Sequence, residues 1–231
     1  MLNRLLSTVL LIVPTLSSAH ARDLLVLNSA FSAPLVGPNH QGAFDILYRE
    51  LGRSLGLDIR IQLIPAERGL LNANAGIEDG DACRIGGLDK IYPHLIQVPE
   101  AIFNFKMSGF AKRVDIKLNG SDSLKPYHVG YLIGWKIVER NLVGAKSATG
   151  YATDKEMFMA LEKEVIDLAI IEKAQGLALL QKHTGIHLLK SPFIQDSCYL
   201  YLHKKHQHLI PKISTELKNM QQNGKFKKIF N

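Results

Sequence analysis

The chain of 231 residues has two cysteines, one tryptophan and a single long apolar run. With so few cysteines, a fold that depends on many disulfides is excluded, but Cys83 and Cys198 are left either as one long-range disulfide or as two buried thiols. The chain also lacks a Gly-x-Ser-x-Gly elbow, a Gly-x-x-x-x-Gly-Lys loop and a His-Glu-x-x-His pair. We therefore expect no enzyme of these classes and no bound cofactor.

The apolar run lies at the N-terminus, where residues 1–21 comprise a basic start with Arg4, an apolar stretch at 5–16 and a small-residue ending at Ala21. About 12 apolar residues are fewer than the roughly 18 to 20 that a permanent membrane-spanning helix needs. A retained anchor is the alternative, but the three-part pattern is typical of a secretory signal peptide. We predict cleavage after Ala21 and a mature protein beyond the membrane.

The formal charge is +7, and it falls to +6 when Arg4 is removed with the signal peptide. An excess of this size suits polyanionic partners, but the basic residues are dispersed except for the run at 225–228. Cations near the C-terminus of a helix complement its dipole, so we interpret this run as a solvated chain end. Together with export, this interpretation predicts no nucleic-acid partner.

Strand and helix patterns alternate along the rest of the chain. An apolar strand at 23–30 precedes a helical stripe from Phe44 to Leu55, and a period-two strand at 59–64 ends at Pro65. The second half repeats this rhythm, with strands at 128–134, 147–153, 167–171 and 186–190 and helices at 135–145, 154–164 and 174–183. Two such blocks predict an α/β fold of two lobes with largely parallel sheets. The polar stretch 104–126 is expected to cross between the lobes.

Four stretches, at 42–65, 65–81, 160–180 and 202–230, resemble the periplasmic solute-binding proteins of family 3, which serve amino-acid ABC transporters. The resemblance implies two lobes joined by a hinge, each a mostly parallel sheet flanked by helices. It assigns residues 22–113 and 198–231 to the first lobe and 114–197 to the second. It also implies a periplasmic monomer that captures a small polar solute between its lobes and works with a membrane permease.

The resemblance further points to five ligand-binding residues near the rim of such a cleft. Arg68 and Arg84 carry planar guanidinium groups that suit a carboxylate, and Phe31 and Trp135 are candidates for stacking on the solute. Glu172 stands where the family commonly has an aspartate that receives an amino group. The alternatives are surface ion pairs for the arginines, packing for the two rings and an exposed position for Glu172.

One departure from the family concerns the solute itself. Amino-acid binders of this type usually carry Thr-x-x-Arg shortly after the glycine-rich strand end, but residues 86–102 contain no arginine. The partner of the solute carboxylate is therefore missing or is supplied by Arg84 or Arg68. A small polar solute, either an amino acid or a related organic anion, is accordingly the safer expectation.

Two polar clusters and two other functions were weighed against this interpretation. The acidic run at 78–81 lacks the oxygen spacing of a calcium loop and is interpreted as a solvated turn. His203, His206 and His208 match no closed metal site, so we expect no metal. The remaining alternatives are a sensor for a membrane signalling receptor and an enzyme similar to cyclohexadienyl dehydratase, with Glu172 as a general acid or base.

Overall fold

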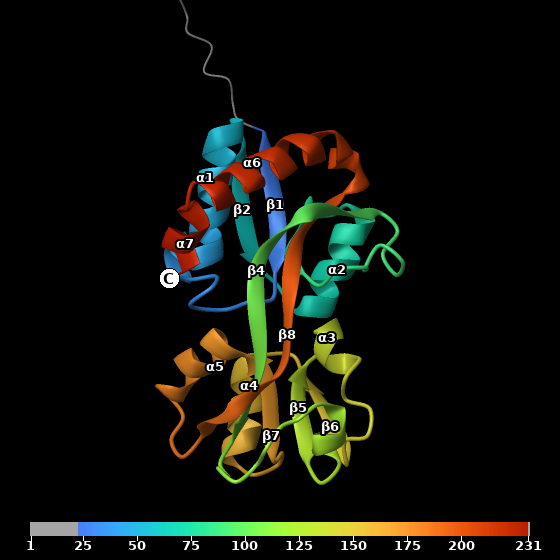
Figure 1. Cartoon of the computed structure of the whole chain (residues 1–231). Coiled ribbons are helices and arrows are strands. Elements are labelled where there is room, and N and C mark those ends of the chain that lie inside the picture. The colour runs from blue at the N-terminus through green and yellow to red at the C-terminus, as the bar shows by residue number, and fades with distance from the viewer. Residues whose placement is uncertain (1–22, 231) are drawn as a thin grey trace, which may run out of the picture.

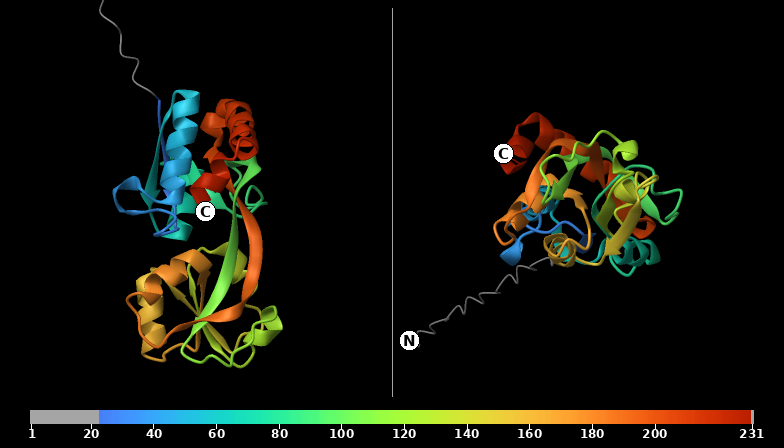
Figure 2. Two further views of the ribbon diagram at one scale, coloured as in Figure 1. Left: turned by 60° about the vertical axis from the view of Figure 1, so that its left-hand side comes forward. Right: turned by 90° about the horizontal axis from the view of Figure 1, so that it is seen from below.

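The computed structural model describes residues 23–230, and the predicted signal peptide at 1–21 lies outside them. The described chain forms two lobes, joined by the long strands β4 (Leu95–Ala111) and β8 (His187–His203), which run side by side from one lobe into the other (Figures 1 and 2). This arrangement confirms the predicted two-lobed α/β architecture. Of the helices in the described part, none has the length and apolarity needed to cross a membrane.

The first lobe contains the parallel strands β1, β2 and β3, covered by helices from both ends of the chain. Its strands are β1 (Leu24–Ser29), β2 (Asp58–Leu63) and β3 (Gly80–Arg84). Its helices are η1 (Pro38–His40), α1 (Ala43–Leu55), α2 (Ala66–Ala75), η3 (Lys204–Leu209), α6 (Ile210–Gln222) and α7 (Lys225–Phe230). As predicted, the apolar stripe of α1 packs inward, burying Phe44, Leu47 and Leu51. The helix ends at Gly56, whose φ of 73° is a left-handed conformation that glycine adopts readily.

The second lobe contains the parallel strands β5, β6 and β7. They are β5 (His128–Leu132), β6 (Ser147–Tyr151) and β7 (Leu168–Glu172). The helices are η2 (Ser121–Leu124), α3 (Lys136–Glu139), α4 (Asp154–Glu162) and α5 (Lys173–Leu180).

Helices α3, α4 and α5 of the second lobe all end before their predicted ends; α5 ends at Leu180 instead of 183. The capping box of Thr153 and Glu156 opens α4 at the predicted start, but the helix ends at Glu162, and Val165 beyond it is 64% exposed. The helix predicted at 135–145 is a single turn, α3. Asn141 donates its side-chain amide to the carbonyl oxygen of Ile137, and this local bond competes with continuation of the helix.

The two lobes share one hydrogen-bonded sheet, in the order β2-β1-β3-β8-β4-β7-β5-β6. Strand β8 pairs antiparallel with β3, and β4 pairs antiparallel with β7. The sequence indicated a polar crossing at 104–126 and a short strand at 186–190. Instead, the crossing begins inside β4, and most of the predicted strand is the start of the longer β8, whose register against β4 shifts in several places. The hinge is therefore a pair of strands, and the predicted lobe boundaries stay a prediction.

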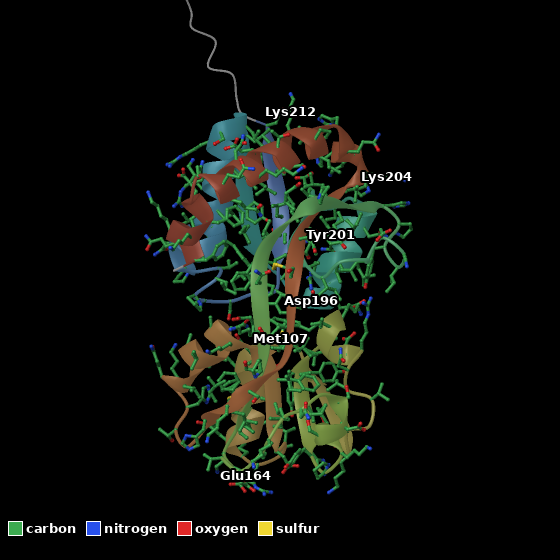
Figure 3. The ribbon with its side chains drawn as sticks, viewed as in Figure 1. Met107, Glu164, Asp196, Tyr201, Lys204 and Lys212 are labelled. Carbon is green, nitrogen blue, oxygen red and sulfur yellow. A yellow bond between two sulfur atoms is a disulfide. The ribbon has the colours of Figure 1, made fainter. Side chains whose placement is uncertain are left out.

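A disulfide joins Cys83 of β3 to Cys198 of β8, with Cα atoms 5.2 Å apart (Figure 3). Both cysteines are buried, and 115 residues of sequence separate them. Strand β8 returns to the first lobe after the chain has formed the second lobe. The disulfide therefore links β3, from before this excursion, to the returning strand β8.

Candidate functional site

The junction of the lobes contains two adjoining pockets that share Ala30 and Trp135. The first, which we call the aromatic pocket, is lined by both lobes and includes Phe31, Arg84 and Lys136; its empty space is about 370 Å³. The second, which we call the Asp154 pocket, has about 600 Å³ of empty space, and both volumes include space open to solvent. Its lining residues from the first lobe are Ser29, Ala30, Ser32, Leu63, Ile64, Pro65 and Ala66, and those from the second lobe are Leu132, Ile133, Trp135, Ala152, Thr153, Asp154 and Gln175.

Phe31 and Trp135 meet where the lobes touch. Their ring centroids are 5.0 Å apart, and both side chains are buried. Phe31 follows the carboxyl end of β1, and Trp135 follows the carboxyl end of β5. In open α/β sheets ligands bind outside the carboxyl ends of parallel strands, so the strand directions explain why these two residues converge.

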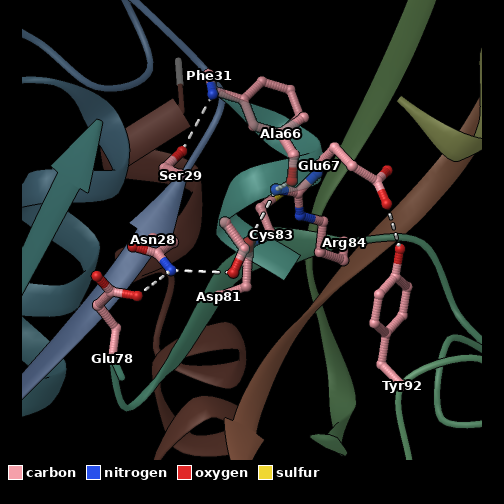
Figure 4. A network of polar contacts seen from close by, with 11 residues as sticks. Asn28, Ser29, Phe31, Ala66, Glu67, Glu78, Asp81, Cys83, Arg84 and Tyr92 are labelled. Atoms are coloured by element: carbon pink, nitrogen blue, oxygen red, sulfur yellow. Dashed lines mark hydrogen bonds and ion pairs between the residues drawn. The ribbon is translucent and has the colours of Figure 1, made fainter. Parts of the chain in front are cut away.

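Arg84 ends β3 at the floor of the aromatic pocket (Figure 4). Its guanidinium pairs with the carboxylate of Asp81 at 2.8 Å and donates to the carbonyl oxygen of Ala66 at 2.9 Å. Its Nε is buried and, among the described residues, makes no hydrogen bond. Burial raises the pKa of Asp81, although the adjacent guanidinium opposes that shift. The interpretation of 78–81 as a solvated turn is therefore wrong for Asp81, which lies fully buried in β3.

The other two predicted ligand residues lie elsewhere. Arg68 is on the exposed face of α2 and lines neither pocket. Glu172 is buried, but its carboxylate accepts a hydrogen bond from the backbone N–H of Gln175 at 3.0 Å and caps α5. The pKa of Glu172 lies above its ordinary value, because burial outweighs the opposing effect of hydrogen bonds from backbone amides. The structure thus brings Phe31, Arg84 and Trp135 together and leaves Arg68 and Glu172 outside both pockets.

Sequence reasoning missed a polar cluster in the Asp154 pocket. Asp154 opens α4, and its Oδ2 accepts hydrogen bonds from the hydroxyl of Ser32 at 2.7 Å and from the side-chain amide of Gln175 at 2.8 Å. Ser32 belongs to the first lobe, so this cluster connects the lobes. The available signal was the position of Asp154 just after the carboxyl end of β6, in the first turn of a capped helix.

A second polar connection between the lobes was also missed. Lys136, the residue after Trp135, pairs with Glu67 of α2 at 2.5 Å and with Glu139 of its own helix at 3.1 Å. Glu67 also accepts a hydrogen bond from the hydroxyl of Tyr92 at 3.1 Å (Figure 4). Beside this pair, Gly134 packs directly on the backbone of α2 at Glu67. The described conformation is therefore closed.

The Glu67–Lys136 pair predicts that closure weakens in acid. Burial raises the pKa of Glu67, but bonds from Lys136 and Tyr92 outweigh it, and the pKa lies below its ordinary value of 4.5. A carboxylate with a lowered pKa stabilises the closed form above its ordinary pKa, and that contribution is lost as pH falls through the lowered value. We expect the radius of gyration from small-angle X-ray scattering to rise when pH falls from 7 to below 4.5.

Variants separate this effect from general acid expansion. Glu67→Gln is expected to remove most of the pH dependence of the radius. Glu164→Gln is the matched control, since Glu164 pairs with Lys112 within the second lobe. An unchanged pH profile in Glu67→Gln would contradict a role for this pair in closure.

The histidines near the end of β8 are not arranged as a metal site. Within residues 23–230, no three His, Cys, Asp or Glu side chains are placed to hold a metal ion. His206, interpreted from the sequence as solvated, instead lies 2.6 Å from the carboxylate of Asp79, which Lys205 also contacts at 2.8 Å.

No protein-family model matches the chain. An uncharacterised protein from Shewanella oneidensis is 25% identical over 203 residues, which cover 83% of this chain and 76% of that protein.

Solved structures show the same architecture. An ancestral arginine-binding protein bound to glutamine is 18% identical, with 91% of this chain and 97% of that chain covered and a TM-score of 0.77. The amino-acid ABC transporter substrate-binding protein AbpA from Streptococcus pneumoniae, bound to L-arginine, is 15% identical, with 90% and 92% covered and a TM-score of 0.73. The chain therefore has the two-lobed fold of the substrate-binding proteins of amino-acid ABC transporters.

Proposed function

We propose that this chain is a periplasmic solute-binding protein that captures a small polar solute between its lobes for an ABC-type importer. The observation that carries this proposal is the closed junction, where Arg84 and Lys136 line one pocket, Asp154 lines the next and Trp135 borders both. The solved structures of similar fold include proteins bound to arginine and to glutamine, which supports an amino acid or a related organic anion as the solute.

The aromatic pocket has donors for an anionic group. Arg84 has five N–H groups, and its contacts with Asp81 and Ala66 leave some of these unused, including the buried Nε. The ammonium of Lys136 has three donors, and two carboxylates contact it. A solute carboxylate in this pocket can accept hydrogen bonds from the unused N–H groups of both side chains. The walls around these donors are apolar and aromatic, which strengthens such charge-assisted bonds.

The Asp154 pocket supplies the opposite charge. The Asp154 carboxylate accepts from three neutral donors, the hydroxyl of Ser32, the side-chain amide of Gln175 and the backbone N–H of Lys155, and retains a lone pair for an ammonium group. A solute that reaches from Arg84 to Asp154 contacts both lobes, so it binds the closed form better than the open form. A zwitterion meets this requirement with both of its charges. The placement of Glu172 does not favour the enzymatic alternative, because its carboxylate caps α5 and lines neither pocket.

A thermal-shift screen tests the proposal directly. The mature chain is mixed with amino acids, polyamines and small organic acids, and the midpoint of unfolding is recorded for each. A solute that binds only the folded form at 100 times its Kd adds about 2.7 kcal/mol to the free energy of unfolding. We expect at least one amino acid or organic anion to raise the midpoint by several degrees. Absence of any shift across the panel would contradict the proposal.

Two arginine variants then locate the site. Arg84→Lys keeps the charge beside Asp81 but removes the planar fork, and we expect it to weaken binding of the solute found in the screen about 10- to 100-fold. Arg68→Ala is the matched control, because Arg68 is exposed on α2, and its affinity should stay within about twofold of the wild type. If Arg68→Ala weakens binding and Arg84→Lys does not, the solute binds beside α2 and not in the aromatic pocket.

A further inference from the structure

The positive charge of this chain is concentrated at residues 203–230, which we call the basic segment. It contains seven lysines and a single acidic residue, Glu216, so it carries a formal charge of +6 out of +7 for the whole chain. The rest of the chain is close to neutral. The run at 225–228 is its densest part, but the excess of positive charge extends over the whole segment.

The basic segment forms one continuous layer on the first lobe. It comprises η3, α6 and α7, which cross that lobe from its outer end toward the junction (Figure 1). Helix α6 buries Ile213, Leu217 and Met220 against the lobe, so its polar side chains are left on the outer surface. Lys204 and Lys212 mark the outer end of the layer (Figure 3).

Fewer than half of these lysines form ion pairs. Lys205 pairs with Asp79 at 2.8 Å, Lys218 with Glu100 at 3.2 Å and Lys225 with Glu50 at 3.8 Å. The other four are exposed and, within residues 23–230, form no ion pair; they are Lys204, Lys212, Lys227 and Lys228. The layer therefore presents four lysines whose charge is not neutralised by neighbours in the described chain.

We propose that the basic segment docks this protein on an anionic phospholipid surface. Lysine ammoniums are compact point charges without the planar fork that selects one phosphate or carboxylate, and here they are spread over three helical elements with no arginine among them. Such a layer matches a diffuse, extended anionic surface, which attracts each basic residue close to it. No residue of the segment lines the aromatic pocket or the Asp154 pocket, so docking leaves the cleft free.

Vesicle co-sedimentation of the mature chain tests this inference. The probe is a vesicle of phosphatidylcholine mixed with phosphatidylglycerol, and pure phosphatidylcholine vesicles are the neutral comparison. We expect binding to the anionic vesicles only, weakened at least tenfold at roughly 1 M salt, where the Debye length is about 3 Å. Equal binding to neutral vesicles, or none to the anionic ones, would overturn the inference.

Two variants with the same net charge distinguish binding through the basic segment from binding caused by the net charge of the protein. The first changes Lys204, Lys212, Lys227 and Lys228 to glutamate, and we expect it to lose at least tenfold in vesicle affinity. The control changes Lys146, Lys155, Lys163 and Lys190, which are exposed on the second lobe, to glutamate. It has the same net charge and should lose less than threefold. Equal losses in both variants would assign binding to net charge and overturn the docking surface.

Circular dichroism establishes that both variants are folded, and solute binding is measured separately for each. The docking inference does not depend on the solute, so vesicle binding in a chain that binds no solute would refute the proposed function alone. Solute binding without vesicle binding would refute only the docking surface.

Discussion

Alanine in place of Gly134 is expected to block closure of the lobes and to lower solute affinity roughly 100-fold, equivalent to about 2.7 kcal/mol. Gly134 has a φ of 86° and lies against the start of α2 in the other lobe. A Cβ added there would overlap the backbone nitrogen of Glu67 and come within 2.7 Å of its Cα. Because these atoms belong to a helix backbone, they cannot move aside as a flexible side chain would. A solute would then reach the contacts of one lobe only.

Calorimetric titration with the solute found in the screen measures this loss, and X-ray scattering reports the accompanying rise in the radius of gyration. Gly144→Ala is the matched control: its φ is 93°, so it carries the same backbone strain, but its added Cβ would meet only Lys125 at 3.9 Å. Both variants are expected to lose about 1 to 2 kcal/mol of stability from the left-handed conformation. Only Gly134→Ala should lose affinity, and similar affinities in the two variants would refute this account of closure.

Removal of the disulfide is expected to lower the free energy of unfolding by about 4 kcal/mol. The bond closes a loop over a separation of 115 residues, and a cross-link over that length restricts the unfolded chain strongly. Cys83 and Cys198 both line the aromatic pocket, and Cys83 precedes Arg84. The bond therefore also holds the strand that carries the guanidinium against β8.

Urea unfolding of the Cys83→Ala/Cys198→Ala double variant measures this effect. Wild-type protein unfolded with and without a reductant provides the comparison, since the double variant should be insensitive to the reductant. A difference below 1 kcal/mol would show that the disulfide contributes little. Retained solute binding in the folded double variant would show that β3 positions Arg84 without the bond.

The elements predicted most accurately are those whose apolar pattern is local and whose ends are marked. Helix α1 has a regular stripe and a terminal glycine, and α4 has a capping box. The helix predicted at 135–145 was too long because its end depends on the side chain of Asn141, which no apolar period reveals. Residues 104–111, the first part of the stretch predicted as a linker, instead lie inside β4. Their polar composition resembles that of a linker, but the hinge of this protein is made of strands.

For the site, strand ends were a better guide than residue type. Phe31, Arg84 and Trp135 follow or end strands whose carboxyl ends converge, and they line one pocket. Arg68 was chosen as an arginine near a helix start, but it is exposed on α2, off the face that the helix buries, and lines neither pocket. Glu172 also ends a strand, yet its carboxylate turned to the free backbone N–H groups of the next helix.

The sequence by itself determined the order of strands and helices, the two-lobed α/β class and the residues that strand ends carry, because apolar period and capping residues act over a few neighbouring positions. Only the tertiary structure decided which polar side chains meet across the junction. Ser32 with Asp154, and Glu67 with Lys136, are far apart in the chain. They meet because β4 and β8 hold the two lobes face to face. A contact between residues so far apart in the sequence leaves no signal in a local pattern.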